Sequence, residues 1–211
     1  MKIVFTSVEN QKNNINNNFT VIILEDCERL LREKYNLTNN ETLYMKIIEI
    51  NQYGMNIPKI EFDIYNKLNS NNLTKLNSSI CSNTLISLYI PVILSDNIDK
   101  HNISSGYYND KCYIKTSDNN VDITLKDRKE EYINNNRVIC QENCDFTFYN
   151  YSSSKAKCSC NIKESSSSYE LMYINKTQLL INIVDFKNNF ENIYILKCYQ
   201  NLFNKIGILY N

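Results

Sequence analysis

Four of the eight cysteines lie within twenty-one residues, in Cys140-Gln-Glu-Asn-Cys144 and Lys157-Cys-Ser-Cys160. Thiols at this density either bind a metal such as zinc or form disulfides. A structural zinc site typically uses two Cys-x2-Cys knuckles or a mixture of Cys and His ligands. These spacings are Cys-x3-Cys and Cys-x-Cys, and the chain has one histidine, His101. The sequence therefore predicts disulfides and no metal site.

The spacing of these four cysteines restricts how they pair. On a strand, Cys158 and Cys160 point to the same side, so each must bond to another part of the chain. Cys140 and Cys144 would present two thiols on one face of a helical turn. We expect Cys140 to bond to Cys158 and Cys144 to Cys160, or the crossed alternative. The other four cysteines would then form two further bridges, Cys81 with Cys112 and Cys27 with Cys198.

The remaining residues that could do chemistry form no catalytic pattern. We expect His101 to be an exposed loop residue. A polar segment could supply oxygen ligands for calcium, but its spacing differs from an EF-hand loop, so we expect a solvated turn with an ion pair of Asp127 or Arg128. That segment contains Asp118, Asn119, Asn120, Asp122 and Asp127. The chain has no nucleophile elbow, no paired carboxylates in an apolar frame and no Gly-rich phosphate loop, which predicts neither an enzyme nor a cofactor.

Asparagine is over-represented, with 36 residues, and this composition is typical of translation from an AT-rich genome. Eight Asn-X-Ser/Thr sequons follow, against about five expected by chance from the same composition, so their number weakly supports N-linked glycosylation. The sequon asparagines are Asn18, Asn36, Asn40, Asn72, Asn77, Asn102, Asn150 and Asn175.

Charge and hydrophobicity exclude some partners. The 23 basic and 23 acidic residues cancel, and no basic stripe is interleaved with aromatics, so we expect no nucleic-acid binding. No apolar run reaches the roughly eighteen residues that a membrane span needs. Disulfides require an oxidising compartment, yet the first residues lack a signal-peptide core. We therefore expect a piece of a longer secreted or membrane-anchored chain.

The apolar periodicity predicts an α+β fold that is mainly antiparallel β, a single sheet or a small sandwich, with a few short helices. Strands are expected at 20–24, 43–50, 57–65, 85–93 and 156–162, and helices at 25–35, 124–133 and 187–205. We divide the chain into a polar lead-in (1–18), a β-rich domain with a long loop (19–137), a stapled hairpin subdomain (138–163), and a linker with a C-terminal helix (164–211). Within the lead-in, Ile3–Phe5 is a candidate edge strand. The Tyr-rich patches at 107–108 and 146–151 are expected mostly in the core.

Five ordered blocks resemble a cysteine-rich extracellular module of large surface proteins from AT-rich unicellular eukaryotes of the ciliate type. The blocks are Gly106–Cys112, Asp122–Arg128, Cys140–Cys144, Lys157–Cys160 and Lys197–Phe203, within residues 19–205. The resemblance implies a membrane-proximal ectodomain, with a membrane anchor beyond Asn211. One departure is Ser117–Asp122, where the pattern tends to have a glycine before the aspartate.

These observations predict an extracellular structural or interaction domain of a cell-surface or secreted glycoprotein, acting in adhesion, a coat or a filament. The expected partners are other copies of the chain or other surface proteins, together with N-linked glycans. A ligand-binding receptor ectodomain is the alternative, and a secreted hydrolase is a weaker one.

Overall fold

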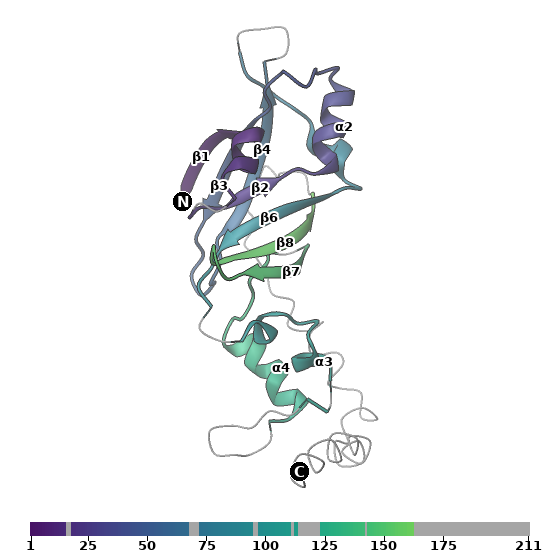
Figure 1. The fold of residues 1–211 in the computed structure, drawn as a ribbon. Coiled ribbons are helices and arrows are strands. Elements are labelled where there is room, and N and C mark those ends of the chain that lie inside the picture. Colours follow the sequence, from purple (N-terminus) through teal and green to yellow (C-terminus); the bar gives the residue numbers. More distant parts are fainter. Residues whose placement is uncertain are drawn as a thin grey trace. The chain divides into compact units, whose positions relative to one another are not determined.

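The computed structural model describes residues 1–15, 18–67, 72–94, 97–110, 112–113, 123–141 and 143–162. These residues form two compact units, one from residues 1–94 and 138–162 and one from residues 97–137. The first, the sandwich unit, contains two antiparallel sheets; the second, the helical unit, contains short helices (Figure 1). The predicted disulfide-stapled α+β fold is confirmed.

The first sheet has the strand order β1-β3-β4-β5, and every neighbouring pair is antiparallel. Its strands are β1 (Lys2–Ser7), β3 (Tyr44–Ile50), β4 (Lys59–Asn66) and β5 (Thr74–Lys75). In β4, Ile60 and Ile64 are buried while Glu61 and Asp63 face the other side, which is the predicted alternation. The candidate edge strand at Ile3–Phe5 is confirmed as part of β1.

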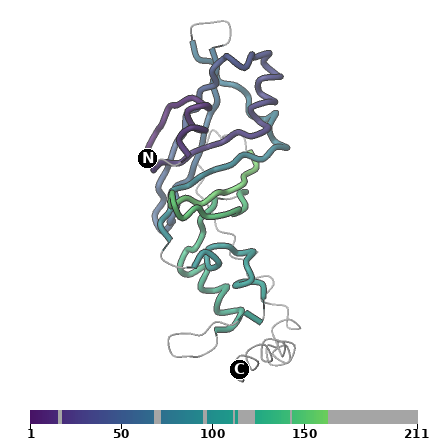
Figure 2. Tube along the Cα trace, in the orientation of Figure 1, coloured from purple at the N-terminus to yellow at the C-terminus, as the bar shows by residue number. Residues whose placement is uncertain are grey.

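The second sheet has the order β2-β6-β8-β7 and is also antiparallel. Its strands are β2 (Val21–Ile23), β6 (Leu85–Pro91), β8 (Lys155–Asn161) and β7 (Cys144–Asn150). Pro91 is the last residue of β6, where a missing N–H is tolerated. Segments far apart in sequence meet in this sheet, as the colours of Figure 2 show. The hairpin β7–β8 is therefore part of the sandwich, because β8 completes its ladder on β6; it is not a subdomain of its own.

One hydrophobic core lies between the two sheets. The first sheet contributes residues such as Ile47 and Ile64, and the second contributes Leu88 and Ile90, all at most 1% exposed. The helix α2 (Asp26–Lys34) adds Leu31, and the 3-10 helix η1 (Ser78–Cys81) precedes β6. The two sheets are thus stabilised by burial of the same apolar surface.

Residues 1–15 are more structured than the polar lead-in that the sequence predicted for residues 1–18. After β1 the chain forms α1 (Val8–Asn13), which is capped by the Ser7 hydroxyl and buries Val8 and Gln11. The Gln11 Oε1 atom accepts a hydrogen bond from the Ile22 N–H at 3.0 Å. Burial of this single glutamine explains why a polar sequence packs against β2.

The helical unit contains η2 (Ile98–His101), α3 (Gly106–Asn109) and α4 (Leu125–Asn134). The predicted cap at Thr124 is confirmed, because its hydroxyl accepts a hydrogen bond from the Asp127 N–H at 3.1 Å. The predicted C-terminal helix at 187–205 and the linker before it lie outside the described residues.

Candidate functional site: disulfides, charged clusters and the open face of the first sheet

Two disulfides fix the hairpin β7–β8 to its surroundings. Cys144 and Cys160 are directly opposed in the ladder and bonded, with 4.0 Å between their Cα atoms. Cys140 lies before the hairpin and is bonded to Cys158, with 5.7 Å between their Cα atoms. The preferred pairing is confirmed and the crossed alternative is wrong. Cys140 and Cys144 do not share a helical turn: a reverse turn with Asn143 at φ 62° leads directly into β7.

The third disulfide corrects the other two predicted bridges. Cys27, in the first turn of α2, is bonded to Cys81 at the end of η1, and both are fully buried. Cys27 therefore does not bond to Cys198, nor Cys81 to Cys112. The cause is tertiary, because α2 packs against η1 and brings together two residues that are 54 positions apart. Cys112 is also disulfide-bonded, and Cys198 lies outside the described residues.

Such bridges persist in oxidising compartments, so they indicate an extracellular or secreted setting. Among the described residues, no helix is long and apolar enough to span a bilayer.

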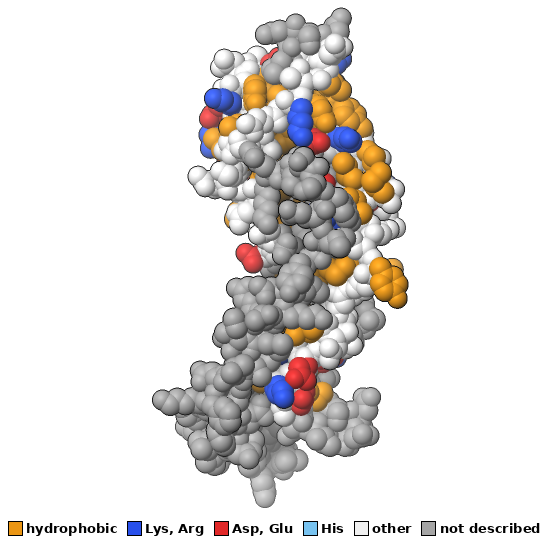
Figure 3. Space-filling model, turned by 180° about the vertical axis from the view of Figure 1, so that it is seen from behind, with side chains coloured by type: hydrophobic (Ala, Val, Ile, Leu, Met, Phe, Trp, Pro, Cys, Tyr) orange, Lys and Arg blue, Asp and Glu red, His pale blue; other side chains and the backbone are white. Residues whose placement is uncertain are grey.

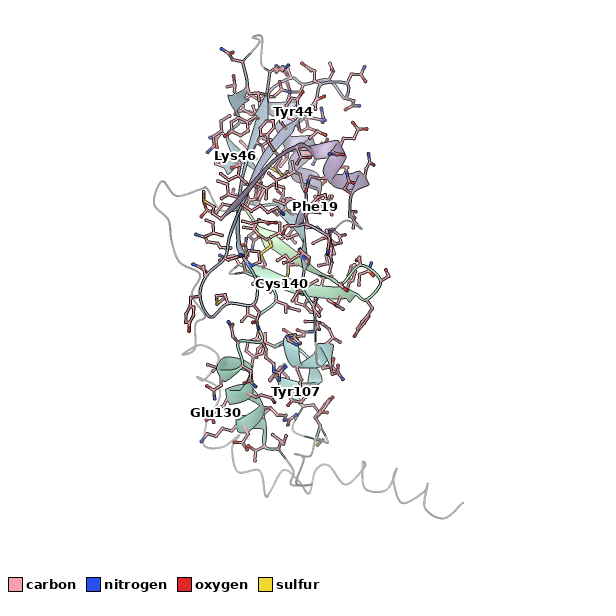
Figure 4. All side chains as sticks on the ribbon, turned by 90° about the vertical axis from the view of Figure 1, so that its left-hand side faces the viewer. Phe19, Tyr44, Lys46, Tyr107, Glu130 and Cys140 are labelled. Carbon is pink, nitrogen blue, oxygen red and sulfur yellow. A yellow bond between two sulfur atoms is a disulfide. The ribbon has the colours of Figure 1, made fainter. Side chains whose placement is uncertain are left out.

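The Glu131 carboxylate accepts hydrogen bonds from three side chains of the helical unit. Its Oε1 atom accepts hydrogen bonds from Lys100 Nζ at 3.0 Å and Arg137 Nη2 at 2.8 Å, and its Oε2 atom accepts one from the Tyr107 hydroxyl at 2.6 Å. Burial alone would raise the pKa of Glu131, but these hydrogen bonds and the two cations lower it below its ordinary value. The neighbouring Glu130 lies away from Tyr107 (Figure 4).

Arg128 joins α4 to α3 from the interior of the same unit. Its side chain is 1% exposed and donates hydrogen bonds to the backbone carbonyls of Tyr107 at 2.6 Å and Asp110 at 3.1 Å. The guanidinium lies 5.5 Å from the Tyr107 ring centroid and 5.6 Å from that of Tyr113. The sequence predicted a solvated Arg128, but Arg128 is not solvated, because its guanidinium binds buried backbone oxygens.

His101 is buried and not an exposed loop residue. It ends η2, is 8% exposed, and its Nδ1 atom lies 3.0 Å from the Arg137 carbonyl oxygen. The polar sequence around it predicted exposure, but η2 turns the ring into the interior of the helical unit. The arrangement is that of a buried structural side chain.

The tyrosine patches divide between interior and surface. Tyr107 and Tyr108 are at most 1% exposed and meet edge to face at 4.8 Å, so their placement in a core is confirmed. Burial raises the pKa of both hydroxyls well above the ordinary value. In the hairpin, Phe148 and Tyr151 are 44% and 72% exposed, so that patch is only partly core.

Seven of the eight sequon asparagines are described and none of them is buried. Five are exposed, whereas Asn102 and Asn150 are half-buried. The exposed ones are Asn18, Asn36, Asn40, Asn72 and Asn77, while Asn175 lies outside the described residues. The side-chain oxygens of Asn77, Asn102 and Asn150 each accept a hydrogen bond from the backbone N–H of the serine two residues later.

The segment whose oxygen ligands were weighed for calcium, and for which the sequence predicted a solvated turn, lies largely outside the described residues. Asp118, Asn119, Asn120 and Asp122 lie outside the described residues, and Asp127 accepts a hydrogen bond from the Thr124 hydroxyl at 2.8 Å. Among the residues that are described, no three His, Cys, Asp or Glu side chains form a metal-binding group. A shallow hollow beside α2 is lined by charged side chains that form ion pairs with each other, Arg32 with Glu28 and Arg29 with Glu33.

Lys155 is a buried amine in the second sheet that the sequence did not single out. It is fully buried, its Nζ donates a hydrogen bond to the Phe19 carbonyl oxygen at 2.7 Å, and it lies 5.6 Å from the Phe19 ring centroid. Burial lowers the pKa of the amine to about 8.

The outer face of the first sheet carries exposed apolar side chains. Ile3 and Phe5 in β1 are 53% and 52% exposed. The Phe5 ring stacks on the ring of Tyr44 in β3, with 5.8 Å between the ring centroids, and its centroid lies 6.2 Å from that of Tyr65 in β4. Lys46 of β3 is opposite Phe5 in the register, and Figure 4 shows the face that carries Tyr44 and Lys46. Figure 1 shows β1 on the left, which is the right-hand side of Figure 3 because that view is turned by 180°. Hydrophobic side chains are concentrated on this right-hand side of Figure 3.

Comparison with known protein families, with curated proteins and with solved structures gives no match.

Sequence reasoning missed the Glu131 cluster, Arg128 and Lys155. The partners of Glu131 lie 6 to 31 residues away and those of Arg128 lie 18 and 21 residues away. Lys155 reaches across 136 positions. No local spacing encodes such contacts. One available signal was the pair Tyr107-Tyr108, which predicted a buried core at this position. It did not predict which charged side chains would pack against that core.

Proposed function

We propose that this chain is an extracellular structural or interaction domain of a cell-surface or secreted glycoprotein, acting in adhesion, a coat or a filament. The observation that carries the proposal is the position of the disulfides. All six cysteines of the three described bridges are built into one sandwich, where they cross-link strands and helices. Bridges with this placement support a scaffold that must resist unfolding outside the cell.

The polar surface is compatible with glycans and the apolar face with protein contacts. Each of the seven described sequon asparagines reaches solvent, as an N-linked glycan requires, and the exposed Ile3 and Phe5 form a patch on an outer sheet face. The chain would present this rigid surface to other copies or to other surface proteins. Its resemblance to a membrane-proximal module of ciliate-type surface proteins would place it next to a membrane anchor.

Glycosylation is tested with a matched pair of variants at one sequon. In Asn40-Glu-Thr42 the asparagine is exposed. Thr42→Ala removes the sequon and Thr42→Ser keeps it. When the chain is secreted from eukaryotic cells, we expect Thr42→Ala to lose the mass of one glycan relative to Thr42→Ser. Enzymatic deglycosylation should bring both variants to the protein mass. If the two variants differ only by the mass difference between Ser and Ala, this sequon is not used.

The location is tested on cells that carry the gene. An antibody raised against the folded chain should label intact cells, or recover the chain from the medium, without permeabilisation. Labelling that appears only after permeabilisation would contradict the proposal.

Intact mass before and after reduction and alkylation should show all eight cysteines oxidised.

A further inference from the structure

The two sheets end in four edge strands, and the described structure protects three of them. Edge strands attract other strands unless they are short, bulged or charged. β5 has two residues and β2 has three. β7 is interrupted by a bulge between Phe146 and Phe148 and exposes Asp145. β1 is different: it has six residues in continuous register with β3, and Ile3, Val4 and Phe5 at its centre are uncharged.

The direction of the backbone groups in β1 follows from one hydrogen bond. The β1–β3 register ends at Ser7 opposite Tyr44, so the next two residues that face each other are Val8 and Leu43. The Val8 N–H donates a hydrogen bond to the Leu43 carbonyl oxygen at 2.9 Å, so Val8 and Leu43 are a hydrogen-bonded pair. In an antiparallel ladder these pairs alternate. Thr6, Val4 and Lys2 therefore direct their N–H and C=O groups to β3, while Ile3 and Phe5 direct theirs outward. Within the described part of the chain, no hydrogen bond involves these outward groups of Ile3 and Phe5.

We propose that β1 is a self-pairing edge, which binds the β1 strand of a second copy in antiparallel orientation about a two-fold axis at Val4. This register places Ile3 opposite the partner's Phe5, so the outward N–H and C=O groups of both residues form a hydrogen-bonded pair. It also buries two side chains that are about half exposed in the single chain. The two first sheets then continue as one sheet across the dimer.

A second copy fits this edge better than an unrelated strand for reasons of charge and symmetry. The chain has a formal net charge of zero, so two copies do not repel each other. Antiparallel pairing sets Lys2 opposite the partner's Thr6, whereas parallel pairing would set the two Lys2 side chains next to each other. Because the contact is two-fold, it closes at a dimer and does not propagate into a fibre. A coat or filament would therefore use these dimers as units joined through another surface.

This inference rests on the proposed function in naming a copy of the same chain as the partner. The first test is the molar mass of the disulfide-bonded chain in solution, measured by sedimentation equilibrium from about 1 μM to 1 mM. We expect a reversible monomer–dimer equilibrium. Phe5→Lys should shift it to monomer, because the change sets a charge against the partner's Ile3. Phe5→Pro should do the same, because it removes an N–H that the β1–β3 ladder does not use.

The matched control is Phe148→Lys on the bulged edge of the other sheet, where the phenylalanine is 44% exposed against 52% for Phe5. It should dimerise like the parent chain. Intact mass and circular dichroism establish that each variant has its disulfides and its sheet content. A parent chain that stays monomeric throughout, or a dimer that survives both Phe5 variants, overturns the proposal.

A cross-link tests the register independently. The two-fold axis brings the two Val4 residues together as a non-hydrogen-bonded pair, where the Cα atoms are about 4.5 Å apart. Val4→Cys should therefore form a disulfide-linked dimer, while Thr6→Cys, which faces the partner's Lys2, should not. A cross-link through position 6 and not through position 4 contradicts the register. A secreted, glycosylated chain that is monomeric would refute the pairing and leave the proposed function intact. An intracellular chain would refute the proposed function even if it dimerised.

Discussion

Tyr107 donates a hydrogen bond to Glu131 between α3 and α4, with 2.6 Å between the two oxygen atoms. The same carboxylate binds Lys100 and Arg137, so one side chain connects η2, α3, α4 and the segment that follows α4. The helices described in the helical unit are short, and short helices are marginal without such contacts. Its stability should therefore depend on this carboxylate.

The pKa of Glu131 predicts acid sensitivity of the helical unit. Burial opposes ionisation, but hydrogen bonds and nearby cations lower the pKa below 4.5, its ordinary value. A lowered folded pKa gives stability that is fully present above pH 4.5 and is lost as the pH falls through the folded pKa. Glu131→Gln should remove this pH dependence and cost about 1–2 kcal/mol near neutral pH. Hydrogen exchange of the α4 amides between pH 3 and 6 measures both effects.

Glu130→Gln is the control for that change. Glu130 is the preceding residue of the same helix, and its carboxylate lies 3.8 Å from Lys126 with both side chains well exposed. Such a pair contributes little. An acid response of α4 that is the same in Glu131→Gln as in the parent chain would show that Glu131 is not its cause.

Arg128→Lys should destabilise the helical unit although it keeps the charge. The planar guanidinium binds the carbonyls of Tyr107 and Asp110 and lies against two tyrosine rings, which a single ammonium group cannot reproduce. We expect a loss of about 2 kcal/mol in the opening free energy of α4, measured by native-state hydrogen exchange. Arg29→Lys on α2, where the arginine side chain is 60% exposed, is the control and should stay within about 0.5 kcal/mol. Equal effects in the two variants would show that the buried contacts of Arg128 do not matter.

The sequence predicted those parts of the fold that depend on local periodicity. Alternation in β4 and β6 and the acidic start and basic end of α2 are properties of neighbouring residues, and so is the capping hydroxyl of Thr124. That Cys158 and Cys160 each bond to another part of the chain followed because a strand directs both to the same side, but the choice between Cys140 and Cys144 as the partner of Cys158 did not follow. The Cys27–Cys81 bridge did not follow, since it depends on how α2 packs against η1, which no spacing encodes. Burial of Arg128 and His101 was missed because their polar neighbours predicted solvent.

The Cys27–Cys81 bridge should stabilise the sandwich more than the Cys144–Cys160 bridge. The first closes a separation of 54 residues and the second one of 16, so in the chain-entropy model they restrict the unfolded chain by about 4 and about 3 kcal/mol. The double variants Cys27→Ala/Cys81→Ala and Cys144→Ala/Cys160→Ala leave no unpaired thiol. Denaturant unfolding should give a lower midpoint for the first. Peptide mapping of the parent chain without reduction should recover Cys27 linked to Cys81, and a link from Cys27 to any other cysteine would contradict the fold.

Lys155 predicts a rise of stability with pH in the alkaline range. Burial lowers the pKa of its amine from 10.5 to about 8, so between these values the unfolded chain binds a proton that the folded chain does not. The free energy of unfolding should therefore increase from pH 8 toward pH 10, with a slope approaching about 1.4 kcal/mol per pH unit for one proton. Lys155→Met should flatten this slope. Lys157→Met, on the same strand but with the amine against the rings of Tyr89 and Phe148, should keep it. Denaturant unfolding at several pH values measures the slope, and an unchanged slope in Lys155→Met would mean that this amine is protonated to the same extent in both states.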